Sequence, residues 1–336
     1  MKKIMDSLMI GSLLVLLAAC GETVGTSGAT NTEGGSKTLK LAHDLGEDHP
    51  VHLALTKFAK TVEESSEGQM KVEIFSNGVL GNEREMLEQI QGGGIDITKV
   101  SAASLESFAS SYSIFSLPYV FDDEEHFFRS MESDAVSDLF ASTEDEGFLG
   151  LTWYDSGSRN FYTADKPIMH PDDLKGLKIR VIDSRTQIEM VKTLGGAPTP
   201  MPYGEIYTAL QSGVIDGAES NPTALTTGKH GEVAKAFSFD EHTRIPDIVV
   251  ISSSAWNNLT ETQQNILKEA AEESTEYQKE IWAEALEAAK KEAENLGVEF
   301  YYPEKGPFRE AASPIYKEYR KDERLAALLD AFNEMR

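Results

Sequence analysis

Apolar and polar residues change their period several times in the first third of the chain. Residues 39–42 and 70–74 alternate with the period of two that is typical of strands. Between them, the apolar residues of 51–62 recur three and four apart, which predicts a helix. A second helical pattern at 83–91 ends in three glycines and leads to a short strand pattern at 95–97. This order predicts a mostly parallel sheet with helices on its faces.

The same rhythm returns in the second half of the chain. Strand patterns at 149–153, 177–181 and 214–216 alternate with helical stretches, although no internal sequence repeat is evident. A further strand pattern at 245–252 is placed to carry the chain from one set of strands back to the other. The pattern therefore predicts an α/β fold in two lobes.

A single long helix is predicted near the carboxyl end. Thr260 and Gln263 have the spacing of a capping box, and apolar residues then keep a spacing of three and four up to Gly297. At 1.5 Å per residue, such a helix is roughly 50 Å long. Because that length exceeds the width of a small lobe, we expect the helix to brace both lobes.

Composition narrows the class of protein. The chain has 336 residues, 40% hydrophobic and 26% charged, which suits about two globular domains. With 56 acidic against 31 basic residues, the net charge of -25 repels a phosphate backbone, so we predict no nucleic acid partner. The acidity also suits solubility in a salty or alkaline medium. Because salt screens charges beyond about 8 Å, a local pocket remains free to attract an anion.

The amino end has the features of a secretion signal. Lys2 and Lys3 precede an apolar run at 8–17, which is shorter than the ~20 residues of a membrane-spanning helix. The run ends in Leu-Ala-Ala-Cys-Gly, which resembles the bacterial lipobox. This resemblance implies that residues 1–19 form a lipoprotein signal peptide and that Cys20 is lipidated after their removal.

The segment after Cys20 predicts a tether. Residues 20–37 are rich in Gly, Ser, Thr and Glu and contain no aromatic residue, which is typical of a flexible linker. Cys20 is also the only cysteine, so lipidation leaves no thiol for a disulfide, a zinc site or a nucleophile. We therefore expect an extracytoplasmic protein that is lipid-anchored to the cell membrane.

Enzyme signatures are missing from the sequence. The chain lacks the Gly-x-Ser-x-Gly, His-Glu-x-x-His and Gly-x-Gly-x-x-Gly motifs and the Walker lysine motif. One cluster has residue types that bind metals, and it comprises His43, Asp44, Asp48, His49 and His52. Its spacing matches no common metal site, and acids at a helix start are favoured by the helix dipole. We therefore predict no catalytic residue, no metal and no cofactor.

Arg180 is the strongest candidate for a ligand contact. It lies in the strand-like apolar run at 177–181, where a charge is costly without a partner. A guanidinium offers a two-pronged donor that fits a carboxylate. The partner is either the carboxylate of a ligand in a crevice between the lobes or an Asp or Glu in a buried structural salt bridge. The residues alone leave both alternatives open.

Several strings in the chain occur together and in the order found in one family. They are His-Pro at 49–50, Val-Leu-Gly-Asn-Glu-Arg-Glu at 79–85, Leu-Pro-Tyr at 117–119, Lys-Gly-Leu-Lys-Ile-Arg at 175–180 and Tyr-Thr-Ala-Leu-Gln-Ser-Gly-Val-Ile-Asp-Gly at 207–217. From about Leu39 to its end, the chain resembles the solute-binding proteins of TRAP (tripartite ATP-independent periplasmic) transporters, the DctP family. The resemblance implies a two-lobe clamshell of the periplasmic-binding-protein type (type II-like), which binds an organic acid without catalysis. It also implies small and large integral-membrane subunits as partners.

The resemblance assigns roles to single residues. Arg180 takes the place of the main carboxylate clamp, and Arg159 that of a second basic ligand residue. Tyr203 takes an aromatic position in the pocket wall, His49 lies where the first loop reaches the ligand, and Glu83 is placed to accept sugar hydroxyls. For Tyr203, His49 and Glu83 the alternatives are core packing, helix capping and a solvated turn, respectively.

The chain departs from the family pattern at 216–222, which reads Asp-Gly-Ala-Glu-Ser-Asn-Pro. The family's ligand-contacting asparagine aligns either with Ser220 or with Asn221, and we favour Asn221. Together with Lys-His at 229–230 and Glu-His at 241–242, this form looks like members that bind hexuronates rather than C4-dicarboxylates.

The predicted lobes are discontinuous in sequence. We assign residues 38–156 and 245–284 to lobe I, and residues 157–244 and 285–336 to lobe II. Three alternatives to a TRAP subunit remain at this point: a ligand-sensing lipoprotein for a signalling receptor, a secreted sugar-acid enzyme, and the binding protein of an ATP-driven importer.

Overall fold

The computed structural model describes residues 36–336, which form one compact unit. The predicted signal peptide, Cys20 and most of the predicted tether lie outside the described residues, and Lys37 is already the first residue of a strand. No helix within 36–336 combines the length and the apolar character that crossing a membrane requires.

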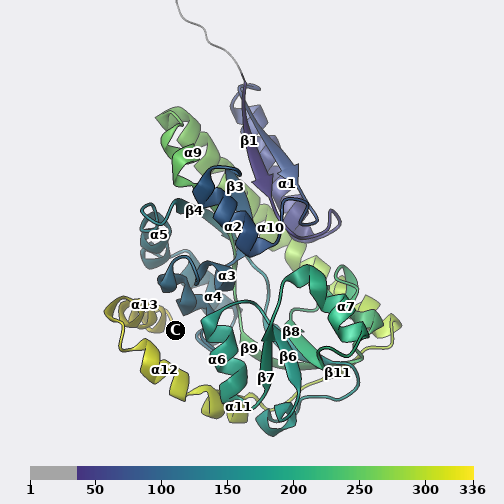
Figure 1. Cartoon of the computed structure of the whole chain (residues 1–336). Coiled ribbons are helices and arrows are strands. Elements are labelled where there is room, and N and C mark those ends of the chain that lie inside the picture. The colour runs from purple at the N-terminus through teal and green to yellow at the C-terminus, as the bar shows by residue number, and fades with distance from the viewer. Residues whose placement is uncertain (1–35) are drawn as a thin grey trace, which may run out of the picture. The chain divides into compact units, whose positions relative to one another are not determined.

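The first sheet and its helices form lobe I (Figure 1). Its strands are β1 (Lys37–Ala42), β2 (Met70–Phe75), β3 (Ile97–Ser101), β4 (Phe148–Tyr154) and β10 (Asp247–Ser252), in the order β2-β1-β3-β10-β4. Strands β1, β2 and β3 are parallel, and β10 runs antiparallel to both of its neighbours. The helices are α1 (Pro50–Ser65), α2 (Glu83–Gly92), α3 (Ala102–Leu105), η1 (Ser110–Ser116), α4 (Glu124–Met131), α5 (Asp134–Ala141) and α9 (Ser253–Asn257).

The second sheet and its helices form lobe II. Its strands are β5 (Arg159–Thr163), β6 (Lys178–Val181), β7 (Ala197–Pro200), β8 (Gly217–Ser220), β9 (Ala236–Thr243) and β11 (Glu299–Tyr301), in the order β11-β9-β5-β8-β6-β7. The helices are η2 (Pro171–Leu174), α6 (Arg185–Thr193), η3 (Tyr203–Glu205), α7 (Ile206–Gln211), α8 (Thr223–Thr226) and η4 (His230–Glu232). The expectation of two α/β lobes is thus confirmed.

The predicted long helix is confirmed as α10 (Glu261–Asn295), which extends from lobe I toward lobe II (Figure 1). Its 35 residues span about 52 Å at 1.5 Å per residue. Thr260 and Gln263 form the predicted capping box, in which each side chain bonds the backbone of the other residue. The helices α11 (Lys305–Ala312), α12 (Pro314–Tyr319) and α13 (Glu323–Glu334) complete the chain.

The two lobes contain the same structural unit, although the sequence shows no repeat. In each, two parallel strands flank a third, and an antiparallel strand follows: β2-β1-β3-β10 in lobe I and β7-β6-β8-β5 in lobe II. Asp96 accepts a hydrogen bond from the backbone N–H of Lys40 at 2.8 Å, and Asp216 accepts one from Lys178 at 2.7 Å. In both lobes the aspartate comes directly before the strand, since β3 begins at Ile97 and β8 begins at Gly217. The strand predicted at 214–216 is therefore wrong, and the one predicted at 95–97 begins two residues too early.

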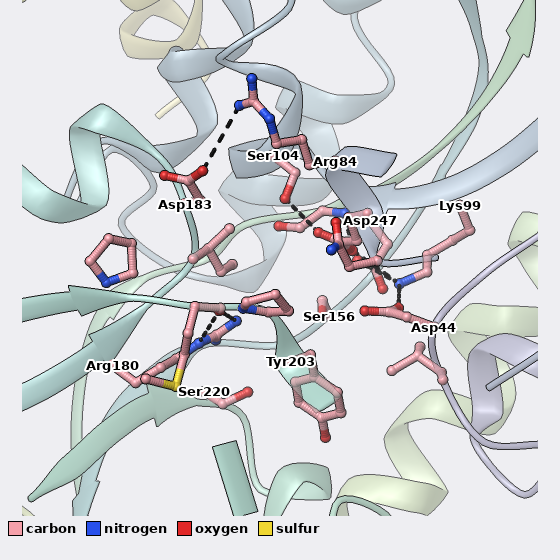
Figure 2. A pocket seen from close by; sticks show the side chains of 18 of the residues that line it. Asp44, Arg84, Lys99, Ser104, Ser156, Arg180, Asp183, Tyr203, Ser220 and Asp247 are labelled. Atoms are coloured by element: carbon pink, nitrogen blue, oxygen red, sulfur yellow. Dashed lines mark hydrogen bonds and ion pairs between the residues drawn. The ribbon is translucent and has the colours of Figure 1, made fainter. Parts of the chain in front are cut away.

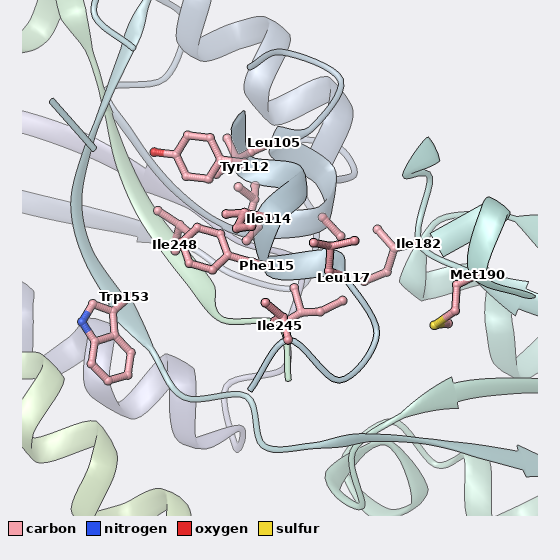
Figure 3. Packing of buried hydrophobic residues seen from close by; sticks show 14 of the residues in the cluster. Leu105, Tyr112, Ile114, Phe115, Leu117, Trp153, Ile182, Met190, Ile245 and Ile248 are labelled. Carbon is pink, nitrogen blue, oxygen red and sulfur yellow. The ribbon is translucent and has the colours of Figure 1, made fainter. Parts of the chain in front are cut away.

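The lobes share an apolar cluster where the chain passes between them. Leu117 and Ile245 pack in one buried cluster with Ile182 and Met190 of lobe II (Figure 3). Two short segments connect the sheets, one from β4 to β5 and one from β9 to β10, and the stretch with α9 and α10 makes the third connection, from β10 to β11. The domain boundaries given above stay a prediction.

One ion pair joins these two connecting segments. Arg244 donates to the Asp155 carboxylate through Nε at 3.2 Å and Nη2 at 2.7 Å. The side-chain amide of Gln278 on α10 bonds both the backbone N–H and the carbonyl of Asp155, at 2.9 and 2.8 Å. Because three segments meet at the buried residue Asp155, the chain is held in a defined geometry next to Ser156, which lines the interlobe cavity.

Candidate functional site

A cavity of about 270 Å³ lies between the lobes and is lined by residues of both (Figure 2). Small-molecule sites are commonly about 300–1,000 Å³, so this cavity suits a ligand near the small end of that range. The six residues predicted for the site all line it: Arg180, Arg159, Asn221, Tyr203, Glu83 and His49.

Arg180 is a buried cation on the lobe II wall. It lies in β6, and its Nε and Nη2 atoms donate to the backbone carbonyl of Met201 at 3.0 and 2.8 Å. Burial lowers the pKa of Arg180. Within residues 36–336, no carboxylate lies at ion-pair distance from Arg180, so the alternative of a structural salt bridge is wrong. The guanidinium has its remaining N–H groups to offer in the cavity.

Arg159, by contrast, is paired within the protein. Its Nε donates to the Glu219 carboxylate at 2.5 Å and its Nη2 donates at 2.9 Å, so the contact is two-pronged. Although burial opposes its ionisation, Arg159 and His242 lower the pKa of Glu219 to about 2. His242 Nδ1 lies 2.7 Å from Asp240, and its Nε2 lies 3.5 Å from Glu219, at ion-pair distance. Arg159 thus reaches the cavity with its charge already compensated.

Tyr203 both lines the cavity and packs against the core of lobe II, so the pocket and packing interpretations hold together. Its ring centroid lies 5.4 Å from that of His230, and burial raises the pKa of the Tyr203 hydroxyl to about 12. The hydroxyl approaches Gly228, where a Cβ atom would lie 2.4 Å from it. Glycine at this position therefore leaves the space that the tyrosine occupies.

His49 caps a helix and also lines the cavity. Its Nδ1 accepts the backbone N–H of Val51 at 3.2 Å, at the start of α1. Burial lowers the pKa of His49 to about 3, so the ring is neutral and carries its proton on Nε2. That Nε2 lies 3.3 Å from Thr223 Oγ1, and Thr223 donates to Asn221 Oδ1 at 2.7 Å. This chain of hydrogen bonds links lobe I to lobe II beside the cavity.

Ser220 and Asn221 differ in how many hydrogen bonds their side chains already make within the protein. Asn221 donates to the carbonyl of Ser156 at 2.9 Å and accepts from both the backbone and the side chain of Thr223. Both residues line the cavity, and the Ser220 hydroxyl has no hydrogen-bond partner within the described residues. Figure 2 shows Ser220 between Arg180 and Tyr203. The geometry thus gives Ser220 the freer polar group, whereas our sequence interpretation favoured Asn221.

Glu83 is held at the amino end of α2. Its Oε1 accepts the backbone N–H of Ser101 at 2.8 Å, and its Oε2 accepts the hydroxyl of Ser104 at 2.5 Å. The side chain is only 17% exposed, so the alternative of a solvated turn is wrong. Burial raises the pKa of Glu83.

Lys99, which the sequence interpretation missed, lies beside Glu83 on the lobe I wall. Its Nζ lies 3.4 Å from Asp44, 3.6 Å from Glu83 and 3.6 Å from Asp247. Although burial opposes its charge, these carboxylates raise the pKa of Lys99. The sequence contains a signal that could have identified Lys99, because this residue carries a charge within an otherwise uncharged, strand-like run. The same kind of signal identified Arg180.

Two of the three histidines considered as metal ligands, His43 and His52, lie at hydrogen-bond distance from each other, whereas His49 caps α1. Burial lowers the pKa of His43 to about 3, and its Nε2 lies 3.0 Å from Nδ1 of His52. Within residues 36–336, no three His, Cys, Asp or Glu side chains form a group suited to a metal ion.

The chain matches the family described as bacterial extracellular solute-binding protein, family 7 (DctP), over residues 41–322. A relative from Salmonella typhimurium, the uncharacterised protein YiiZ, is 44% identical over 296 residues, which cover 88% of this chain and 90% of the relative.

Solved structures give the same family. A TRAP periplasmic solute-binding protein from Anaerococcus prevotii with bound α/β-D-glucuronate matches with a TM-score of 0.87 and 40% identity, over 89% of this chain and 98% of that one. A TRAP solute-binding protein from Sulfitobacter with bound β-D-galacturonate matches with a TM-score of 0.86 and 32% identity, over 89% and 100%. These proteins bind solutes and are not enzymes, as we expected for this chain. The chain belongs to the DctP family of solute-binding proteins, the family of TRAP transporter solute receptors.

Proposed function

We propose that this protein captures a hexuronate outside the cytoplasm and delivers it to the small and large membrane subunits of a TRAP transporter. One observation carries the proposal: the cavity has one guanidinium without a carboxylate partner among the described residues, that of Arg180. A ligand with one carboxylate satisfies this cation. The bound sugars of related structures, D-glucuronate and β-D-galacturonate, have this chemistry.

The remaining wall suits the hydroxyl groups of a sugar acid. Arg180 is the proposed carboxylate clamp, and Arg159, with its charge compensated, is a proposed hydrogen-bond donor. Ser220 or Asn221 and the Tyr203 hydroxyl add neutral polar groups, and His49 and Glu83 approach from lobe I. Charged hydrogen bonds contribute about 1.5–3 kcal/mol net each. Two such hydrogen bonds at the ligand carboxylate, together with several weaker hydrogen bonds at its hydroxyl groups, supply the roughly 8 kcal/mol of binding free energy of a micromolar complex.

A thermal-shift screen followed by titration calorimetry tests this proposal. The ligands are D-glucuronate, D-galacturonate, succinate, malate and sialic acid. A ligand that binds the folded state stabilises it by RT ln(1 + [L]/Kd), so at equal concentrations the tightest ligand raises the melting temperature most. We expect stabilisation by one or both hexuronates. A protein that responds to succinate or malate and to neither hexuronate would contradict the proposed ligand.

We propose in addition that Cys20 anchors the protein to the membrane, an assignment supported by the lipobox resemblance. Radiolabelled palmitate should enter the wild-type protein in cells, and Cys20→Ala should prevent both labelling and removal of the signal peptide. Absence of label from the wild-type protein would exclude lipid anchoring.

A further inference from the structure

The lobe I wall carries more negative than positive charge. Lys99, Asp44, Glu83 and Asp247, here called the acidic wall, come from β3, from the segment after β1, from α2 and from β10. One ammonium lies among three carboxylates, at 3.4 to 3.6 Å from each. Arg84 of α2 and Asp183 of lobe II also line the cavity and form an ion pair at 3.9 Å, so their charges offset each other. With its four groups ionised, the acidic wall has a net charge of -2, and with one carboxyl protonated it still has -1. The sign of the wall is therefore the same in both cases.

The opposite wall carries a cation without an ion-pair partner among the described residues. Arg159 and Glu219 compensate each other, whereas Arg180 has no ion-pair partner among the described residues. Figure 2 shows Arg180 on one side of the cavity, with Lys99, Asp44 and Asp247 on the other. A ligand carboxylate placed on Arg180 therefore points the rest of the molecule toward carboxylate oxygens. Those oxygens accept hydrogen bonds from hydroxyl groups and repel a second anion.

We propose that the acidic wall, through Asp247 and its counter-ion Lys99, selects ligands with one carboxylate and excludes those with a second carboxylate at the far end. This inference rests on the proposed hexuronate function and adds the residues that reject diacids. Lys99 acts as a positioning residue. It is 2% exposed, and it offsets part of the repulsion that would otherwise separate three buried carboxylates.

Two substitutions should change the selectivity in opposite directions. Asp247→Asn keeps the shape of the side chain and removes one negative charge, so a diacid meets less repulsion. Lys99→Met removes the positive charge and leaves the carboxylates uncompensated, so a diacid meets more. Glu64→Gln is the matched control, because Glu64 lies on the exposed side of α1 and pairs with Lys60, and neither residue lines the cavity.

The experiment compares D-galacturonate with galactarate, which has the same six-carbon skeleton and a carboxylate at each end. Titration calorimetry gives both dissociation constants for the wild type and each variant, after circular dichroism has established folding. We expect the wild type to prefer galacturonate at least 30-fold, Asp247→Asn to reduce that preference about tenfold, and Glu64→Gln to change it less than twofold. If Lys99→Met folds, it should increase the preference for galacturonate over galactarate. If Lys99→Met does not fold, the result for Asp247→Asn alone decides the test.

The two proposals fail differently. A wild-type protein that binds neither galacturonate nor glucuronate overturns the hexuronate function and this inference with it. A wild type that binds a hexuronate, together with an Asp247→Asn variant whose preference stays within twofold of the wild type, overturns the role of the acidic wall alone.

Discussion

Replacing Arg180 by glutamine removes the guanidinium that has no carboxylate partner within residues 36–336, and it should abolish tight binding while the fold persists. The fold should persist because the neutral amide can still donate toward the carbonyl of Met201, which Nε and Nη2 of Arg180 bond at 3.0 and 2.8 Å. A polar, uncharged replacement is also less costly to bury than the arginine that it replaces.

The magnitude follows from what the ligand carboxylate loses. Of the five N–H donors of Arg180, those not used on Met201 remain for a two-pronged contact. Breaking a buried ion pair by removing one partner costs about 3–5 kcal/mol. At about 1.4 kcal/mol per tenfold change, the dissociation constant should rise roughly 150- to 4,000-fold. Arg180→Lys keeps the charge and loses the fork, so it should show a smaller loss of about 10- to 100-fold.

Titration calorimetry with the best hexuronate from the ligand screen measures these changes, and thermal melting without ligand checks the fold. Arg320→Gln is the matched control, since Arg320 is exposed and pairs with Asp330 on the C-terminal helices. It removes one positive charge far from the cavity and should change affinity less than twofold. If the affinity of Arg180→Gln for the hexuronate stays within threefold of the wild-type value, the proposal that Arg180 binds the ligand carboxylate is refuted.

Three further predictions concern the groups that support the site. Glu219→Gln should weaken hexuronate binding about tenfold or more in calorimetry, because Arg159 loses its buried partner; unchanged affinity would contradict that support. Asp240 and Glu219 overcome burial to raise the pKa of His242 to about 9. Since an unfolded histidine titrates near 6.5, its stabilising charge is fully present below about pH 6.5 and is lost as the pH rises through 9. The difference in melting temperature between wild type and His242→Gln should therefore shrink across that interval, and a constant difference would show that the histidine is neutral. Gly228→Ala should destabilise the protein by about 1–3 kcal/mol in urea unfolding, because its Cβ would lie 2.6 Å from a backbone carbonyl. Gly204→Ala, which meets nothing within 4 Å, is the control and should be nearly neutral.

Most elements could be predicted because their signals are local. The capping box at Thr260 and the unbroken spacing up to Gly297 define α10 without any tertiary contact. The strand at 214–216 was placed too early because a valine-isoleucine pair looks like a strand. The Asp216 side chain bonds a backbone N–H of the neighbouring strand there, and no local pattern reveals that bond.

The site could be predicted only in part for a related reason. Arg180 stood out because a charge in an apolar run needs a partner. That Arg159 is compensated and Arg180 is not depends on Glu219, which lies 60 residues from Arg159 in sequence. The acidic wall depends on contacts between four separate segments, so its charge balance becomes visible only in the folded chain.

The structural unit common to both lobes has a consequence for the direction in which a ligand binds. Lys99 and Glu219 each follow the strand-leading aspartate by three positions, one as a cation among acids and the other as an acid among cations. The same structural unit thus carries charges of opposite sign in the two lobes, and the two ends of the cavity between them differ in charge. A molecule with a single anionic end can enter productively one way round only. In binding proteins of this architecture, substitutions on the lobe I wall therefore change which ligand is bound, while the cation of lobe II continues to bind the carboxylate.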